Sequence, residues 1–158
     1  MNMRRLQPFC GILFALACAL AFRAQAAALP DKFDPQRDPA ADVAAAVAQA
    51  KAEGKRVLVD VGGEWCSWCH IMDRFFAADA EARALRDAAF VMVKVNYSRE
   101  NKNTAFLSRW PRIAGYPHLF VLDTDGALLH SQDTGQLEAG KGYDRTKFVA
   151  FLRAWSPR

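Results

Sequence analysis

Two mainly apolar runs occupy the middle of the chain, and segments with helical periodicity surround them. Residues 56–61 and 90–95 consist mainly of Val, Leu, Phe and Met. A strand that shows no polar alternation is buried on both faces, so both runs are predicted to be central strands of one sheet. The turn sequence Asp125-Gly126 predicts a hairpin. Its two strands are predicted at residues 118–122 and 128–131.

Helices are predicted between and around these strands. Asp38-Pro39 supplies an N-cap and a first-turn proline for a helix that ends at Gly54. The other predicted helices cover residues 67–76, 79–85, 101–110 and 143–155, and a loop is expected over 135–142. This order of elements predicts an α/β domain, with a mixed central sheet flanked by helices on both faces.

The first 26 residues have the pattern of an export signal. Arg4 and Arg5 precede a continuous apolar stretch over residues 9–22, and Ala24-Gln25-Ala26 follows as a small-x-small cleavage site. The apolar stretch is shorter than the roughly 20 residues that a membrane-spanning helix needs. We therefore expect a cleaved signal peptide rather than a permanent anchor.

Cleavage before Ala27 divides the chain into three parts. The signal peptide is residues 1–26, an extended lead-in covers 27–37, and a single domain covers 38–158. Export of this kind places the domain in the periplasm. The alternative is lipoprotein processing at Cys18, which would attach the domain to a membrane.

Loss of the leader changes both the charge and the cysteine content. Three of the four net positive charges come from Arg4, Arg5 and Arg23, so the domain gives no reason to expect a nucleic acid or an anionic surface as partner. Only Cys66 and Cys69 then remain. A disulfide that closes so short a loop restricts the unfolded chain little, so a redox role explains the pair better than a structural one.

The two cysteines lie where the first strand ends and the next helix begins, within Trp65-Cys66-Ser67-Trp68-Cys69-His70. Cysteines at this spacing can close a small disulfide ring and reopen it. The unpaired N–H groups of a helix N-terminus stabilise a thiolate there. The motif therefore indicates a dithiol/disulfide redox centre.

The order of elements and several local signatures resemble the thioredoxin superfamily over residues 38–156. Asp60 lies six residues before the first cysteine, Lys94-Val95-Asn96 closes the second strand, and Gly115-Tyr116-Pro117 stands where that family keeps its cis-proline. The resemblance implies a thioredoxin-like fold. It also implies a thiol–disulfide oxidoreductase that requires neither a metal nor an organic cofactor.

The positions of the residues assign roles around the cysteine pair. Cys66, at the helix start and expected to be the more exposed, would attack a disulfide, and Cys69 would resolve the mixed disulfide. Asp60 alternates with Leu58 on a buried strand, so its carboxyl is expected under the cysteines with a raised pKa, where it can exchange a proton with Cys69. Lys94 is its expected charge partner. The alternative for Asp60 is a buried hydrogen bond or ion pair without a catalytic role.

Other residues are expected to contact substrate or to tune the site. Trp65 and Trp68 would form an apolar rim, with one ring exposed and the other packed. A cis bond before Pro117, which the resemblance implies, would turn the backbone of Tyr116 toward an extended substrate strand. The alternative for Pro117 is an ordinary proline that leads a strand. His70, in the first helical turn, would tune the acidity of the thiols.

Three other functions fit parts of the pattern. Cys-x-x-Cys-His is also the attachment site of c-type haem, with Met72 or Met92 as axial ligand, but small c-type cytochromes are helical. A zinc site would need more than two thiolates and His70, and His118 and His130 lie in strand positions. A redox-inert thioredoxin fold that docks partners through its tryptophan rim is the third alternative.

We therefore predict a monomeric periplasmic oxidoreductase that exchanges disulfides with protein thiols. No basic residue separates the cysteines, which favours a reductase or isomerase over a strong oxidant. Ser67-Trp68 replaces the Gly-Pro dipeptide of thioredoxin itself, which leaves the redox potential open. A reductant in an oxidising compartment needs a source of electrons, so a membrane electron carrier is the expected upstream partner.

Overall fold

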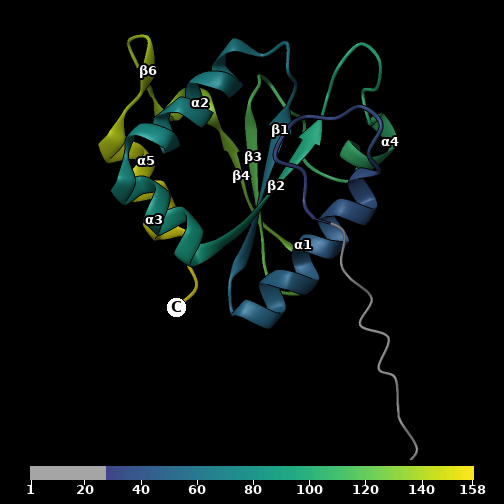
Figure 1. Cartoon of the computed structure of the whole chain (residues 1–158), viewed down its shortest axis with the longest axis horizontal. Helices are drawn as coiled ribbons and strands as arrows, with labels where there is room; N and C mark the ends of the chain where they lie inside the picture. Colours follow the sequence, from purple (N-terminus) through teal and green to yellow (C-terminus); the bar gives the residue numbers. More distant parts are fainter. Residues whose placement is uncertain (1–27) are drawn as a thin grey trace, which may run out of the picture.

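A mixed four-stranded sheet lies between two layers of helices in the computed structural model (Figure 1). The structure describes residues 28–158, so the predicted signal peptide, its cleavage site and Cys18 lie outside the described residues. The strands run in the order β2-β1-β3-β4, with β1 and β2 parallel and the other pairs antiparallel. Their bounds are Arg56–Gly62 for β1, Phe90–Asn96 for β2, His118–Leu122 for β3 and Leu128–Asp133 for β4.

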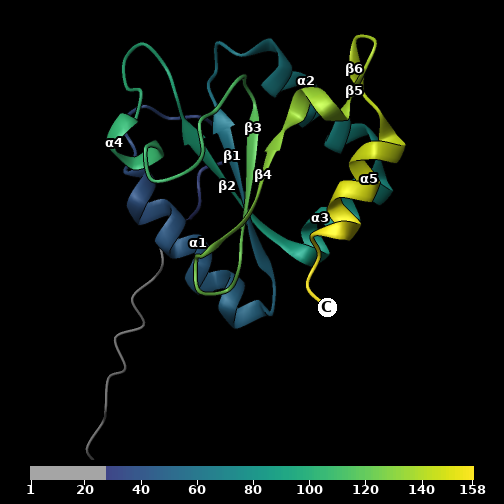
Figure 2. The ribbon, with the colours of Figure 1, turned by 180° about the vertical axis from the view of Figure 1, so that it is seen from behind.

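Helices cover both faces of the sheet (Figures 1 and 2). One face carries α1 (Pro39–Glu53) and the short α4 (Thr104–Leu107). The opposite face carries α2 (Ser67–Ala78), α3 (Ala80–Ala89) and α5 (Arg145–Ala154). This arrangement confirms the predicted fold class. Within the described part of the chain, no helix has the length and apolar character to span a membrane.

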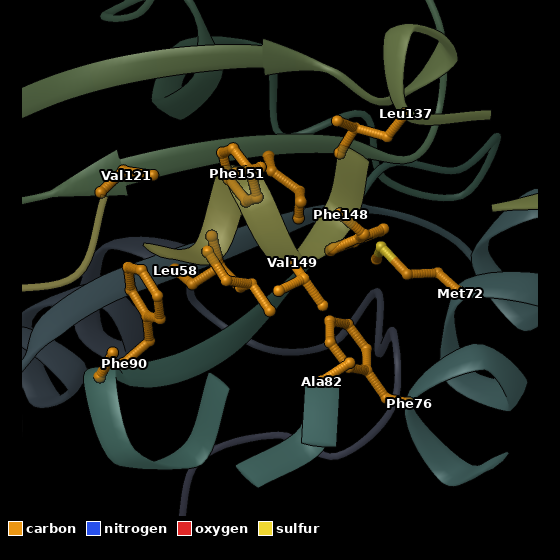
Figure 3. Packing of buried hydrophobic residues seen from close by; sticks show 13 residues of the cluster. Leu58, Met72, Phe76, Ala82, Phe90, Val121, Leu137, Phe148, Val149 and Phe151 are labelled. Carbon is orange, nitrogen blue, oxygen red and sulfur yellow. The ribbon is translucent and has the colours of Figure 1, made fainter. Parts of the chain in front are cut away.

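The side chains of β1 alternate between the two halves of the core. Val57, Val59 and Val61 are buried on the face that α1 covers. Leu58 points to the other face, where it packs with apolar residues of α2, α3 and α5 (Figure 3). Because Asp60 alternates with the valines, it lies on the same face as Leu58, beneath α2.

The predicted helix ends are set by local capping. The Asp38 side chain accepts a hydrogen bond from the Ala40 N–H, and Gly54 ends α1 with a left-handed φ of 66°. Asp79 caps α3 in the same way through the Ala82 N–H. These contacts satisfy N–H groups that have no partner within the helix.

The helix expected over 79–85 continues to Ala89 as α3, and two other segments differ in kind from the prediction. The helix expected over 101–110 is reduced to α4, because Asn103 takes a left-handed φ of 49° and its side chain donates to the Asn96 carbonyl oxygen. The loop expected over 135–142 contains a 3₁₀ helix and a small hairpin. Their bounds are Thr134–Leu137 for the 3₁₀ helix, Glu138–Ala139 for β5 and Gly142–Tyr143 for β6.

Candidate redox site at the start of helix α2

Cys66 and Cys69 form a disulfide at the N-terminus of α2, with their Cα atoms 5.3 Å apart. Cys66 is the N-cap residue, and its Sγ accepts a hydrogen bond from the Cys69 N–H at 3.2 Å. The first turn of the helix therefore directs a backbone donor at the Cys66 sulfur. A negative charge on that sulfur is stabilised by this donor and by the helix dipole.

Both cysteines are enclosed by neighbouring side chains. Cys66 is the more exposed of the two, as expected, but only by a small margin, because it is 3% exposed and Cys69 is fully buried. The aromatic rings of Phe33, Trp68 and Tyr116 pack against the pair. A reacting molecule therefore reaches the disulfide only at the edge of Cys66.

Asp60 is fully buried on the face of β1 that carries the cysteines. Gly62 is the next position on this face, and a Cβ atom built there would overlap Cys69 Sγ. Asp60 Oδ2 accepts a hydrogen bond from Lys94 Nζ at 3.0 Å, whereas Oδ1 has no hydrogen-bond partner among the described residues. Burial raises the pKa of Asp60 to about 6, although Lys94 acts in the opposite direction. A carboxyl of this kind can accept and return a proton near neutral pH.

Lys94 connects Asp60 to the first turns of α2. In the parallel register of β1 and β2 it lies opposite Asp60, and its Nζ also donates to Asp73 Oδ1 at 2.8 Å. Burial lowers the pKa of Lys94, but the two carboxylates outweigh this effect and leave it raised. Lys94 is therefore an ammonium that forms ion pairs with a buried and a half-exposed carboxylate at once.

The two tryptophans of the motif have different environments. Trp65 is 58% exposed, and its indole N–H donates to the Tyr97 carbonyl oxygen at 2.7 Å. Trp68 is partly buried and packs edge-on against the Tyr143 ring, with centroids 5.6 Å apart. One ring is thus exposed and the other packed, and the exposed ring is Trp65.

Tyr116 and Pro117 lie beside the cysteines, just before β3. The Tyr116–Pro117 peptide bond is cis. The Tyr116 ring stacks on Tyr97 with centroids 4.5 Å apart and meets the edge of Trp65 at 5.8 Å. The Thr134 hydroxyl donates to the Pro117 carbonyl oxygen at 2.5 Å. The rings form an aromatic wall next to the reactive edge of the disulfide.

A surface hollow of about 530 Å³ adjoins this wall. Trp65 and Tyr97 form its apolar side. The remaining lining residues are polar or charged: Ser98, Arg99, Glu100 and Lys102. The combination of an exposed indole and polar groups beside a reactive sulfur suits contact with a polypeptide.

The three histidines have partners away from the sulfur atoms. His70 Nε2 lies 2.8 Å from the Glu64 carbonyl oxygen, so this nitrogen donates a hydrogen bond. The bond links the first turn of α2 to the loop before the cysteines. His118 Nε2 bonds to the Ser131 hydroxyl at 2.8 Å, and His130 stacks on Trp155. Within residues 28–158, no group of three or more His, Cys, Asp or Glu side chains is arranged to hold a metal ion.

Phe33 is a site residue that the sequence analysis did not identify. It belongs to the expected lead-in, yet it is only 3% exposed and packs against both cysteines. Its backbone N–H donates to Glu64 Oε1 at 2.9 Å, which gives Glu64 a structural partner. A single large aromatic residue in the polar stretch Pro30-Asp31-Lys32-Phe33-Asp34 was the available signal.

Comparisons with known proteins agree with this geometry. A family model described as thioredoxin-like matches residues 38–124, a range that includes both cysteines, Asp60, Lys94 and Pro117. None of the curated proteins matches the chain significantly in sequence.

Several solved structures share the fold. A disulphide isomerase from Xylella fastidiosa Temecula1 is 24% identical, with a TM-score of 0.66 over 82% of this chain and 98% of that chain. The C-terminal domain of DsbD from Neisseria meningitidis, in its oxidised form, is 22% identical, with a TM-score of 0.57 over 78% and 98% of the two chains. A DsbH oxidoreductase is 20% identical, with a TM-score of 0.54 over 98% and 92%.

Replacing Asp60 with Asn should stabilise the oxidised protein at neutral and alkaline pH. A folded-state pKa raised from 3.8 to about 6 means that the native state holds this proton more tightly than the unfolded chain. Wild-type stability should therefore fall as the pH rises from about 4 to about 6, by up to about 3 kcal/mol. In the variant Lys94 loses its ion pair with residue 60, and this loss offsets part of the gain in stability. Urea unfolding should show Asp60→Asn to be more stable by about 1–2 kcal/mol at pH 8, with most of the gain absent at pH 4.

The matched control is Asp87→Asn, which removes an exposed carboxylate of α3. Its effect should stay within about 0.5 kcal/mol at both pH values. A gain from Asp60→Asn that is equal at pH 4 and pH 8 would show that the charge on Asp60 is not its cause.

Replacing Gly62 with Ala should disturb the contact between β1 and Cys69. The added methyl group would overlap Cys69 Sγ and lie 3.0 Å from Phe33 Cζ. Overpacking of this kind costs about 1–3 kcal/mol. Gly142→Ala is the control, because no atom lies within 4 Å of a Cβ built there. Urea unfolding of both variants tests the packing, and equal stabilities would refute the close approach.

Proposed function

Since the chain belongs to the thioredoxin-like family, we propose that it is a thiol–disulfide oxidoreductase that acts on polypeptides through Cys66 and Cys69. The observation that carries the proposal is the disulfide at the N-terminus of α2, above a buried carboxyl with a raised pKa. The two sulfur atoms store and release the electron pair themselves. The exchange therefore needs no metal or organic cofactor.

In the reducing direction, the Cys66 thiolate attacks one sulfur of a substrate disulfide. A bond forms between Cys66 and that sulfur, and the other substrate sulfur leaves as a thiolate that takes up a proton. Cys69 then attacks Cys66 Sγ and releases the second substrate thiol. The substrate gains two electrons, and the enzyme is left with the Cys66–Cys69 disulfide.

Asp60 is the proposed proton acceptor for Cys69. Cys69 has no exposure to solvent, so its proton needs an acceptor within the protein. Asp60 lies on the same face of β1, with Oδ1 unpartnered among the described residues and Oδ2 held by Lys94. With a pKa of about 6, Asp60 is mostly ionised at pH 7 and can take the proton. The reverse transfer would protonate the Cys69 thiolate when the disulfide is reduced.

Substrate contact is assigned to the surface beside Cys66. Trp65 offers an exposed indole, and the ring of Tyr116, which precedes the cis bond to Pro117, packs against it. An extended polypeptide with its disulfide over Cys66 would pair with the Tyr116 backbone. Trp68 and His70 stabilise the motif instead: Trp68 packs against Tyr143, and His70 bonds to the Glu64 carbonyl oxygen.

We further propose that the protein works as a monomeric reductase or isomerase in the periplasm. The export pattern of residues 1–26 and the lack of a basic residue between the cysteines support this assignment. The names of similar structures, a disulphide isomerase and a DsbD domain, are consistent with it. A reductant in an oxidising compartment must be recharged, so a membrane electron carrier would supply its electrons.

One alternative is favoured by a specific observation. Because Cys66 is only 3% exposed, the chain has features of a docking module in which the disulfide is never opened. Such a module would bind partners through Trp65 and the neighbouring hollow. Substitution of the cysteines separates the two functions.

Cys66→Ser and Cys69→Ser should fail at different steps. Cys66→Ser lacks the attacking sulfur and should reduce insulin disulfides at the background rate. Cys69→Ser can still attack but cannot resolve, so it should accumulate a mixed disulfide with substrate, visible on a non-reducing gel. Insulin reduction at the same rate by wild type and Cys66→Ser would favour the docking module.

Trp65→Ala should weaken substrate binding while leaving the rate of disulfide exchange in the bound complex nearly unchanged. The indole is exposed, so its removal should leave stability nearly unchanged while KM for a protein substrate rises about threefold to tenfold, with little change in kcat. Leu128→Ala is the matched control, because among residues 28–158 Leu128 is the other exposed large apolar residue, and it lies on β4. Equal KM values for wild type and Trp65→Ala would remove Trp65 from the substrate surface.

A further inference from the structure

We propose that Phe33 is a positioning residue of the redox site, whose ring seals the Asp60–Lys94 pair from water and holds the Lys94 ammonium in place. The inference rests on the proposed proton transfer by Asp60. Phe33 lies in the segment before α1, outside residues 38–124 that the family model matches.

The first observation is the place of the ring. Phe33 is 3% exposed and packs with Cys66 and Cys69 in one buried cluster. A Cβ atom built on Gly62 would lie 3.0 Å from Phe33 Cζ and would overlap Cys69 Sγ. The ring and the Cys69 sulfur therefore meet above Gly62, the position next to Asp60 on this face of β1.

The second observation is the contact with Lys94. Its Nζ lies 4.3 Å from the centre of the Phe33 ring, 3.0 Å from Asp60 Oδ2 and 2.8 Å from Asp73 Oδ1. An ammonium has three N–H donors, and two of them point at these carboxylates. The aromatic face stabilises the remaining positive charge and takes the place of water. The Lys94 side chain is accordingly only 9% exposed.

The third observation is that the backbone of the segment is anchored independently of the ring. The Phe33 N–H bonds to Glu64, and the Asn101 side chain donates to the Pro35 carbonyl oxygen at 2.9 Å. Arg37 bonds to both Asp42 and the Ala28 carbonyl oxygen. Figure 1 shows this segment in purple, leading into α1. A smaller side chain at position 33 should therefore leave the path of the backbone in place.

The ring acts on Asp60 without carrying a charge. The charged and titratable groups that face Asp60 are Lys94 from β2, Asp73 and Cys69 from α2, and Tyr143 from β6. Burial is the largest cause of the raised pKa of Asp60. Opening the seal admits water, which stabilises the ionised carboxylate and lowers this pKa.

The test uses Phe33→Ala and Phe33→Leu in the purified protein. Phe33→Ala removes the seal, and Phe33→Leu keeps an apolar cover without the aromatic face. The control is Phe106→Ala, because Phe106 is also buried (8% exposed) with a cation, Arg109, 4.2 Å above its ring, but lies on the opposite side of the sheet. Two pH series are measured: the carboxyl chemical shift of Asp60 in the oxidised protein, and the rate at which mixed disulfide is resolved.

We expect Phe33→Ala to lower the midpoint of the Asp60 titration by about one pH unit, with Phe33→Leu shifted less in the same direction. The rate profile should move with it, and Phe106→Ala should move neither. A folded Phe33→Ala with the wild-type midpoint would overturn the inference, as would an equal shift in Phe106→Ala. If Phe33→Ala does not fold, Phe33→Leu decides, and an unchanged midpoint in that variant overturns the inference.

The two pH series separate this inference from the proposed function. If Asp60 does not transfer the proton, the rate of mixed-disulfide resolution in the wild type will not follow the titration of Asp60. The chemical shifts of the Phe33 variants would still show whether the ring excludes water. Failure of the seal alone would leave the wild-type rate profile intact and the Phe33 variants identical to it.

Discussion

The ion pair between Asp60 and Lys94, enclosed beneath a disulfide, is the interaction on which the site depends. A carboxyl in the middle of a sheet loses its hydration, and Lys94 restores only part of that loss through Oδ2. The remaining cost keeps the pKa of Asp60 near the pH at which thiols exchange protons. The same burial that makes ionised Asp60 unfavourable for folding therefore gives it the raised pKa on which its proposed proton exchange with Cys69 rests.

Three separate parts of the chain build this environment. The parallel register of β1 and β2 sets Asp60 opposite Lys94. Helix α2, with Cys66 as its N-cap, places Cys69 against Gly62, where the absence of a side chain makes room for the sulfur. The segment that precedes α1 then places the Phe33 ring over Lys94, the partner of Asp60. The cysteines are thus one part of a layered site rather than an isolated motif.

The sequence predicted the elements whose signals are local. The apolar runs of β1 and β2, the cap at Asp38 and the cysteine pair all carry information within a few residues. Phe33 could not be placed in this way, because its partners lie about thirty or more residues away and only the tertiary fold brings them together. The helix expected over 101–110 is shorter because Asn103 takes a left-handed backbone conformation and its side chain donates a hydrogen bond to Asn96 at the end of β2, which overrides helical propensity.

The central claim is that the two sulfur atoms interconvert between bonded and free states as a mild reductant would require. Equilibrating the protein with mixtures of reduced and oxidised glutathione, followed by thiol trapping, measures this directly. We expect a reversible two-electron transition with a potential nearer to about −270 mV than to about −120 mV. A pair that stays oxidised across all mixtures, or a potential close to about −120 mV, would contradict it.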